Sequence, residues 1–113
     1  MKEGDVLLAA LRQADGQIKD RPVLFLKQMP PFSDFCVCGI STQIKHRVEG
    51  FDELIGHADA DFPQSGLKAS SIIRLGYLAV LPRSAFKGRI GSVSQARLDR
   101  LLTSLSGFFS PKA

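Results

Sequence analysis

The feature that most constrains the fold is a series of short apolar runs separated by turn-forming residues. The runs cover residues 6–10, 23–26 and 35–40, and none is longer than six residues. Asp15-Gly16 and Pro30-Pro31 lie between them, and Pro22 opens the second run. Runs this short favour strands over helices. The spacing therefore predicts three strands, although periodicity alone does not separate a strand from a helix start at residues 6–10.

The second half of the chain contains a longer apolar segment at residues 70–81. Gly76 lies within it and indicates a bulge or bend, and Pro82 ends it. Residues 47–55 are more polar and predict a weak strand and a turn, while residues 57–66 predict a loop. Residues 88–91 predict a turn or a short strand.

One helix is predicted near the C-terminal end. Ser94 is a good N-cap, Gly107 is expected to end the helix, and the leucines between them recur at helical spacing: Leu98, Leu101, Leu102 and Leu105. Several strands and one C-terminal amphipathic helix predict a single domain over residues 1–113. Its expected fold class is β-rich α+β, or a small barrel.

The formal net charge of +4 is unevenly distributed. Residues 1–67 hold seven Lys or Arg and ten Asp or Glu, a net −3, whereas residues 68–113 hold eight basic residues and one acidic residue, a net +7. Such asymmetry favours a polyanion or an acidic protein as partner. A solvated basic surface is the alternative interpretation.

Membrane and secreted classes fit the sequence poorly. No apolar run reaches the roughly 20 residues of a membrane helix. Residues 1–16 carry acids and lack a clear cleavage site, so they do not resemble a signal peptide. The only cysteines, Cys36 and Cys38, give half a metal site at most and predict strand packing. A reduced, cytoplasmic protein without a metal is therefore expected.

Polar residues at strand ends are the best candidates for chemistry, because phosphate-loop, zinc-protease and serine-hydrolase motifs are absent from the sequence. Arg21 stands at a strand entrance, and Ser41-Thr42-Gln43 follows the third run. An arginine there can bind phosphate in a bidentate manner, and a hydroxyl can donate to another phosphate oxygen. The alternatives are an ion pair of Arg21 with Asp20 or Asp5, and turn formation at Ser41 and Thr42.

Six segments stand in a characteristic order and spacing: Gly4-Asp5-Val6, residues 19–26 with Arg21-Pro22 among them, Ile40-Ser41-Thr42-Gln43, residues 71–75, residues 87–91 and the closing helix. Together they resemble the MazF/PemK family of toxins. The resemblance implies a small barrel-like antiparallel sheet, related to that of the toxin CcdB, with helices packed on it. It also implies a homodimer that cleaves single-stranded RNA at short sequences without metal or cofactor, and that is blocked by an acidic antitoxin.

The resemblance further implies roles for individual residues. The catalytic arginine of the family falls on Arg21, and its catalytic hydroxyl falls on Ser41, with Thr42 as a neighbour that could substitute. His46 is the candidate general base, since histidine titrates near neutral pH. Candidate substrate-binding residues are Lys19, Phe32, Gln43, Arg74, Lys87 and Arg89. Phe32 is a candidate for base stacking, whereas Phe35 is expected to pack in the core.

Two departures from the family pattern matter. Residues 76–79 are largely apolar where many members carry a polar Gln-x-Arg, which argues against an RNA contact or a dimer contact from that strand. The acidic residues of segment 49–61 would repel RNA and are expected away from the groove. Two other functions therefore remain open: a non-catalytic inhibitor of a protein such as DNA gyrase, and a degenerate member that only binds RNA or its antitoxin.

Overall fold

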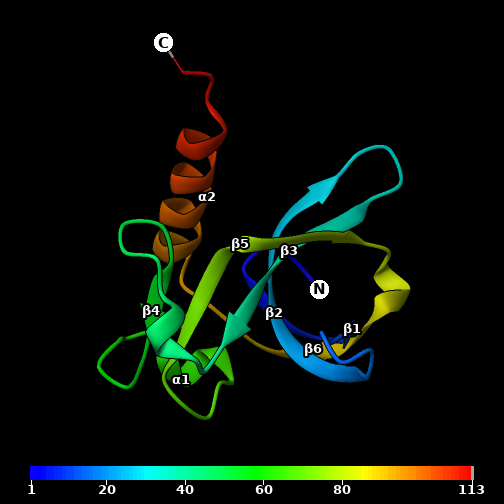
Figure 1. Cartoon of the computed structure of the whole chain (residues 1–113), viewed down its shortest axis with the longest axis horizontal. Coiled ribbons are helices and arrows are strands. Elements are labelled where there is room, and N and C mark those ends of the chain that lie inside the picture. The colour runs from blue at the N-terminus through cyan, green and yellow to red at the C-terminus, as the bar shows by residue number, and fades with distance from the viewer. Residues whose placement is uncertain (113) are drawn as a thin grey trace.

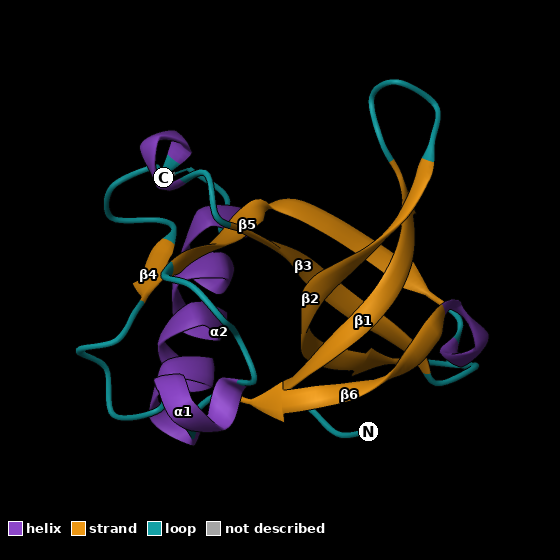
Figure 2. Ribbon diagram, turned by 90° about the horizontal axis from the view of Figure 1, so that it is seen from below, coloured by secondary structure: helices purple, strands orange, loops and turns teal. Residues whose placement is uncertain are grey.

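The computed structural model describes residues 1–112. Six strands form one antiparallel sheet: β1 (Asp5–Arg12), β2 (Ile18–Met29), β3 (Asp34–Ser41), β4 (Glu53–Ile55), β5 (Ser71–Leu81) and β6 (Phe86–Ser92). Their order across the sheet is β4-β5-β3-β2-β1-β6. The sheet curls strongly, and within residues 1–112 its edge strands β4 and β6 do not pair with each other (Figures 1 and 2). The predicted β-rich α+β class is confirmed, with a curled rather than closed sheet.

Both faces of the sheet are covered, which explains why the strands are apolar runs rather than alternating patterns. Leu24 and Leu26 of β2 belong to a core that also contains helix residues, whereas Val23 and Phe25 belong to a second core on the other face. The expectation that Phe35 packs in the core is confirmed, because its ring stacks on that of Phe25 with centroids 3.9 Å apart. The well-packed central strands thus hold the residues at their ends in fixed positions.

Two α-helices pack beside the curled sheet: α1 (Phe62–Ser65) and α2 (Gln95–Phe109). Ser94 caps α2 as predicted, since its hydroxyl oxygen accepts from the backbone N–H of Arg97 at 3.2 Å. The expected stop at Gly107 is wrong, because α2 continues to Phe109. Phe108 packs on Phe51 with centroids 4.9 Å apart, and a glycine within a helix costs only about 1 kcal/mol. No helix described in residues 1–112 combines the length and apolarity needed to span a membrane.

The longer apolar segment is confirmed as the strand β5, and Gly76 lies in a bulge. Arg74 pairs with Gly39 and Leu78 pairs with Cys38, so three residues of β5 lie between adjacent partners on β3. Residues 57–66 are not wholly a loop, because they contain α1, and residues 88–91 are part of the strand β6. One-turn 3-10 helices lie at Ile44–His46 and Arg83–Ala85.

Candidate active site

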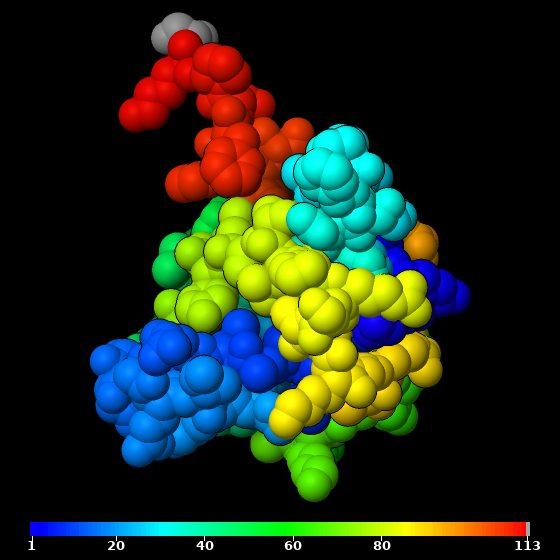
Figure 3. Space-filling model, turned by 90° about the vertical axis from the view of Figure 1, so that its right-hand side faces the viewer, coloured from blue at the N-terminus to red at the C-terminus, as the bar shows by residue number. Residues whose placement is uncertain are grey.

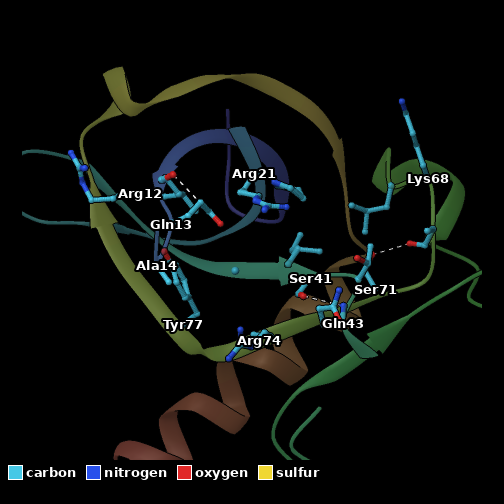
Figure 4. A pocket seen from close by; sticks show the side chains of 17 residues that line it. Arg12, Gln13, Ala14, Arg21, Ser41, Gln43, Lys68, Ser71, Arg74 and Tyr77 are labelled. Carbon is cyan, nitrogen blue, oxygen red and sulfur yellow. Dashed lines mark hydrogen bonds between the residues drawn. The ribbon is translucent and has the colours of Figure 1, made fainter. Parts of the chain in front are cut away.

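A pocket of about 480 Å³ lies where the β1–β2 hairpin, the end of β3 and the bulged strand β5 meet (Figure 4). The loop before β5 forms a further wall through residues 67–69. The pocket brings together five of the residues that the sequence singled out: Arg21, Ser41, Thr42, Gln43 and Arg74. Residues separated by more than fifty positions in the chain therefore share one cavity.

The two main catalytic candidates lie on neighbouring strands, just beyond the last pair of the β2–β3 ladder. That pair joins Val23 of β2 to Gly39 of β3. Arg21 and Ser41 each lie two residues beyond it, where Arg21 pairs with Ala9 of β1 and Ser41 pairs with Ile72 of β5. Both residues line the pocket. A guanidinium and a hydroxyl can thus reach the same phosphate group from neighbouring strands.

The Ser41 hydroxyl is held in place by its own turn. Its oxygen accepts a hydrogen bond from the backbone N–H of Gln43 at 3.0 Å, drawn as a dashed line in Figure 4. Within residues 1–112 the hydroxyl proton has no hydrogen-bond acceptor, so it remains available to a ligand. Turn formation and a donor role are therefore compatible at Ser41, and they use different parts of the same group.

Arg21 makes no ion pair or hydrogen bond through its side chain within the described part of the chain. The carboxylates that were the alternative partners are already engaged: Asp20 accepts from Lys87 at 2.8 Å, and Asp5 accepts from Arg89 at 3.0 Å. The ion-pair interpretation of Arg21 is therefore wrong. The guanidinium is exposed at the pocket with its donors available.

The charge of the pocket is entirely positive among its described lining residues. Four cations line it, Arg12, Arg21, Lys68 and Arg74, and no Asp or Glu does. Arg12 donates to the carbonyl of Gly16 at 2.9 Å across the hairpin turn, which fixes its position. Arg12 and Lys68 were not predicted as site residues. The only signal for Lys68 was its place at the start of the basic half of the chain.

The structure does not bring every predicted residue to the pocket. Lys87 and Arg89 lie on β6 in the ion pairs described above, and Lys19 does not line the pocket. His46 is exposed in a one-turn helix and is likewise absent from the lining.

Phe32 is also away from the pocket. It is exposed in the turn between β2 and β3, at the opposite end of β2 from Arg21. The eight steps from Arg21 to Met29 correspond to roughly 26 Å of extended strand. Figure 3 shows this turn (cyan) well apart from the β1–β2 hairpin (blue). Phe32, the stacking candidate from the sequence, is therefore not among the residues that the structure brings together at the pocket.

The acidic segment gathers elsewhere, as expected. Glu53, Asp59 and Asp61 surround the buried guanidinium of Arg97, with the closest contact 2.8 Å from Arg97 Nε to Asp61 Oδ2. Hydrogen bonds from Arg97 lower the pKa of Asp61 to about 2. A second cavity borders this cluster, and it shares no lining residue with the pocket. Carboxylates are thereby kept off the cationic pocket.

The cysteines fit the predicted packing role. Cys38 is fully buried on β3, and burial raises the pKa of its thiol. Burial also raises the pKa of the Cys36 thiol. A thiol with a raised pKa holds its proton at neutral pH and is a poor nucleophile. Neither cysteine lines the pocket.

Comparisons with known proteins agree with the geometry. The family model described as "PemK-like, MazF-like toxin of type II toxin-antitoxin system" matches residues 2–109. The fold is similar to that of the Mycobacterium tuberculosis toxin MazF-mt6, with a TM-score of 0.70 and 20% identity over 96% of this chain and 99% of that one. It is also similar to a mycobacterial structure described as an endoribonuclease in complex with its cognate antitoxin, with a TM-score of 0.70 and 15% identity over 100% of this chain and 99% of that one. None of the curated proteins compared with the chain matches it.

Proposed function

The chain belongs to the PemK-like, MazF-like family of type II toxin–antitoxin toxins, and from this premise we propose that it is a metal-independent endoribonuclease that cleaves single-stranded RNA selectively at short sequences. One observation carries the proposal. An arginine without a side-chain partner within residues 1–112 and a hydroxyl with an available proton line the same pocket, which has four cations and no carboxylate among its described lining residues. This is the arrangement that a phosphodiester requires, because its charge is negative throughout the reaction.

The proposed reaction is an internal transfer at phosphorus. The RNA 2′-oxygen forms a bond to the adjacent phosphorus and loses its proton, while the bond from phosphorus to the 5′-oxygen breaks and that oxygen gains a proton. The products are a 2′,3′-cyclic phosphate and a 5′-hydroxyl. Arg21 donates to the non-bridging oxygens, where charge builds up, and to the leaving oxygen. Ser41 donates to a second non-bridging oxygen, and Thr42 is adjacent to it.

The general base is proposed to be water rather than a side chain. His46, the candidate from the sequence, does not line the pocket. We expect His46→Ala to cleave RNA within about threefold of the parent rate, because a positioned general base contributes 10²-fold or more when present. A loss of about 10²-fold in the cleavage rate would instead support His46 as the general base.

The test is cleavage of a long single-stranded RNA by the purified protein in excess EDTA. We expect discrete fragments with 5′-hydroxyl ends. Arg21→Ala and Arg21→Lys should cleave about 10²–10³-fold more slowly, the usual loss when one transition-state donor is removed. Arg83→Ala is the matched control, because Arg83 is an exposed arginine that does not line the pocket. Equal rates for Arg21→Ala and the parent would contradict the assignment.

Intact RNA in every sample would refute the nuclease proposal. A gyrase inhibition assay would then test the non-catalytic toxin. Tight RNA binding without cleavage would instead identify a degenerate, binding-only member of the family.

The proposal extends to partners. A similar structure contains a cognate antitoxin, and a cationic pocket suits an acidic antitoxin segment. We propose that the chain acts as a cytoplasmic homodimer that such an antitoxin inhibits. Light scattering after size exclusion gives the oligomeric state. If a short acidic protein is encoded next to this chain, its addition should suppress cleavage, and cleavage at an unchanged rate would contradict this part.

A further inference from the structure

The ring of Tyr77 lies directly over the backbone of Gly39 at the pocket. A Cβ atom built on Gly39 would be 3.2 Å from Cδ1, 3.3 Å from Cγ and 3.4 Å from Cβ of Tyr77. These contacts are tighter than ordinary packing, so any larger residue would push the ring away. Gly39 has no left-handed backbone conformation that would require glycine. Close approach of the tyrosine ring is therefore the physical reason for a glycine at this position.

The β5 bulge is what lets Tyr77 reach the pocket. Residues three apart on a regular strand point to opposite faces. Arg74 and Tyr77 are three apart, yet both line the pocket, because the bulge lies between Arg74 and Leu78. The bulge thus places an aromatic ring beside a cation.

Tyr77 remains accessible to a ligand. The residue is 40% exposed, and within residues 1–112 its hydroxyl has no hydrogen-bond partner. It is the only tyrosine of the chain, and no other aromatic residue lines the pocket. In Figure 4 it lies toward the end lined by Gln13 and Ala14, whereas Ser41 lies toward the other end. The pocket therefore has an aromatic end and a hydroxyl end, with Arg74 between them.

We propose that Tyr77 is the stacking platform for one nucleobase of the bound RNA, and this inference rests on the proposed RNA-cleaving function. Proteins bind unpaired bases by stacking them on aromatic rings while cations hold the phosphates. Arg21, Ser41 and Arg74 hold the phosphate, and the base next to it lies on the ring. Gln13 donates its amide N–H to the carbonyl of Leu11 at 3.1 Å, which leaves its side-chain oxygen to accept from the base edge.

This proposal differs from the expectation drawn from the sequence, which argued against an RNA contact from residues 76–79. The contact on this strand is aromatic rather than polar. The Tyr77 ring binds an unpaired base through the flat face of the base. Gln13 then distinguishes between bases, because its side-chain oxygen accepts only from a base that carries an N–H donor on its edge.

The direct test follows the Tyr77 ring by NMR. Protein labelled with ¹³C in its tyrosine ring gives one aromatic spin system, since the chain has one tyrosine. It is titrated with a 2′-O-methyl single-stranded RNA, which cannot be cleaved, and separately with an abasic oligonucleotide of equal length. We expect the ring protons to shift upfield with the RNA, through the ring current of the base, and to stay in place with the abasic strand.

Affinity measurements on variants complete the test. Tyr77→Ala should bind the RNA about tenfold more weakly, the usual effect of losing one stacked base, and should bind the abasic strand within about twofold of the parent. Tyr77→Phe should keep the affinity for RNA, and Gly39→Ala should weaken it less than Tyr77→Ala. Phe109→Ala is the control, because it removes an exposed aromatic ring that does not line the pocket.

The outcomes separate this inference from the function on which it rests. If the parent cleaves and binds RNA, but the ring does not shift and Tyr77→Ala binds as tightly as the parent, the stacking role is refuted and the nuclease proposal stands. If the parent neither binds nor cleaves RNA, both proposals fail together.

Discussion

The side chain of Ser41 combines two functions in one hydroxyl group. Its oxygen holds the turn through the N–H of Gln43, and its proton has no acceptor within residues 1–112. We expect Ser41→Ala to reduce the cleavage rate about 10²-fold, because it removes a donor to the developing charge. Ser41→Thr should stay within about fivefold, since threonine keeps the hydroxyl and suits a strand end. Single-turnover rates on a defined RNA measure this, and equal rates for the alanine and threonine variants would contradict a donor role.

At the residue scale, the resemblance to the toxin family singled out Arg21 and Ser41, and the structure brings both to one pocket. They lie on β2 and β3, which are adjacent in the chain and pair directly, although their catalytic roles stay predictions. Arg12, Lys68 and Tyr77 were missed for a physical reason. Their approach depends on the curl of the sheet and on the β5 bulge. Gly76 indicated a bulge or bend in the sequence, but it did not indicate which side chains the bulge would bring to the pocket.

At the scale of elements, one buried ion pair joins the two α-helices. Asp61 precedes α1, accepts from the backbone N–H of Ser94, and binds Arg97 of α2 through two guanidinium nitrogens. These bonds hold the pKa of Asp61 at about 2, below its ordinary value of 3.8. The unfolded chain therefore takes up this proton more readily than the folded chain, so acid favours unfolding.

The ion pair predicts a specific pH dependence. Asp61 contributes about 2 kcal/mol of stability above pH 4, and this is lost as the pH falls from about 4 to 2. Asp61→Asn should be less stable than the parent at pH 7 by at least this amount, and the difference should shrink below pH 4. Urea unfolding at several pH values measures it. A difference that does not change with pH would show that Asp61 contributes nothing by its charge.

The contact between α1 and β6 depends on glycine. A Cβ atom on Gly91 would overlap the backbone of Ser65 and Gln64, which cannot move without shifting α1. We expect Gly91→Ala to destabilise the fold by about 1–3 kcal/mol, as overpacking does. Gly107→Ala is the matched control, because its Cβ would enter open space on α2 and should stabilise the helix by up to about 1 kcal/mol. Equal unfolding midpoints for the two variants would contradict this.

Elements with a strong local signal were predicted well, and short ones were not. The strands β1, β2, β3 and β5 follow from apolar runs, and the start of α2 follows from Ser94. The four-residue helix α1 was missed because it is held by tertiary contacts, the Asp61 ion pair among them, rather than by its own periodicity. The sequence predicted the end of α2 two residues too early, at Gly107, because the packing of Phe108 on Phe51 extends the helix to Phe109.

At the scale of the whole molecule, ion pairing decides which cations remain free to bind a polyanion, and their position in the chain does not. Much of the basic half is neutralised by the acidic half: Lys87, Arg89, Arg97 and Arg100 all pair with carboxylates of the first 61 residues. The pocket cations have no such carboxylate partner in residues 1–112. The net charge therefore understates how strongly the pocket attracts polyanions.

The four cations of the pocket predict the salt dependence of RNA binding. If each pocket cation holds one phosphate, log K should fall with log salt with a slope of about −3, or about 0.7 per phosphate. Lys68→Ala should reduce the slope by about 0.7. Lys27→Ala should leave it unchanged, because Lys27 lies outside the pocket beside Glu3. Filter binding across a salt series measures the slopes, and equal slopes for the two variants would contradict the assignment.

The position of Tyr77 has an optical consequence. The chain has no tryptophan and one tyrosine, so the near-ultraviolet emission of the protein originates almost entirely from one ring at the rim of the pocket. Circular dichroism in the far ultraviolet reports the sheet instead. An unfolding experiment recorded with both signals therefore compares the edge of the pocket with the sheet. A lower midpoint for the tyrosine emission would show that the edge of the pocket unfolds before the sheet does.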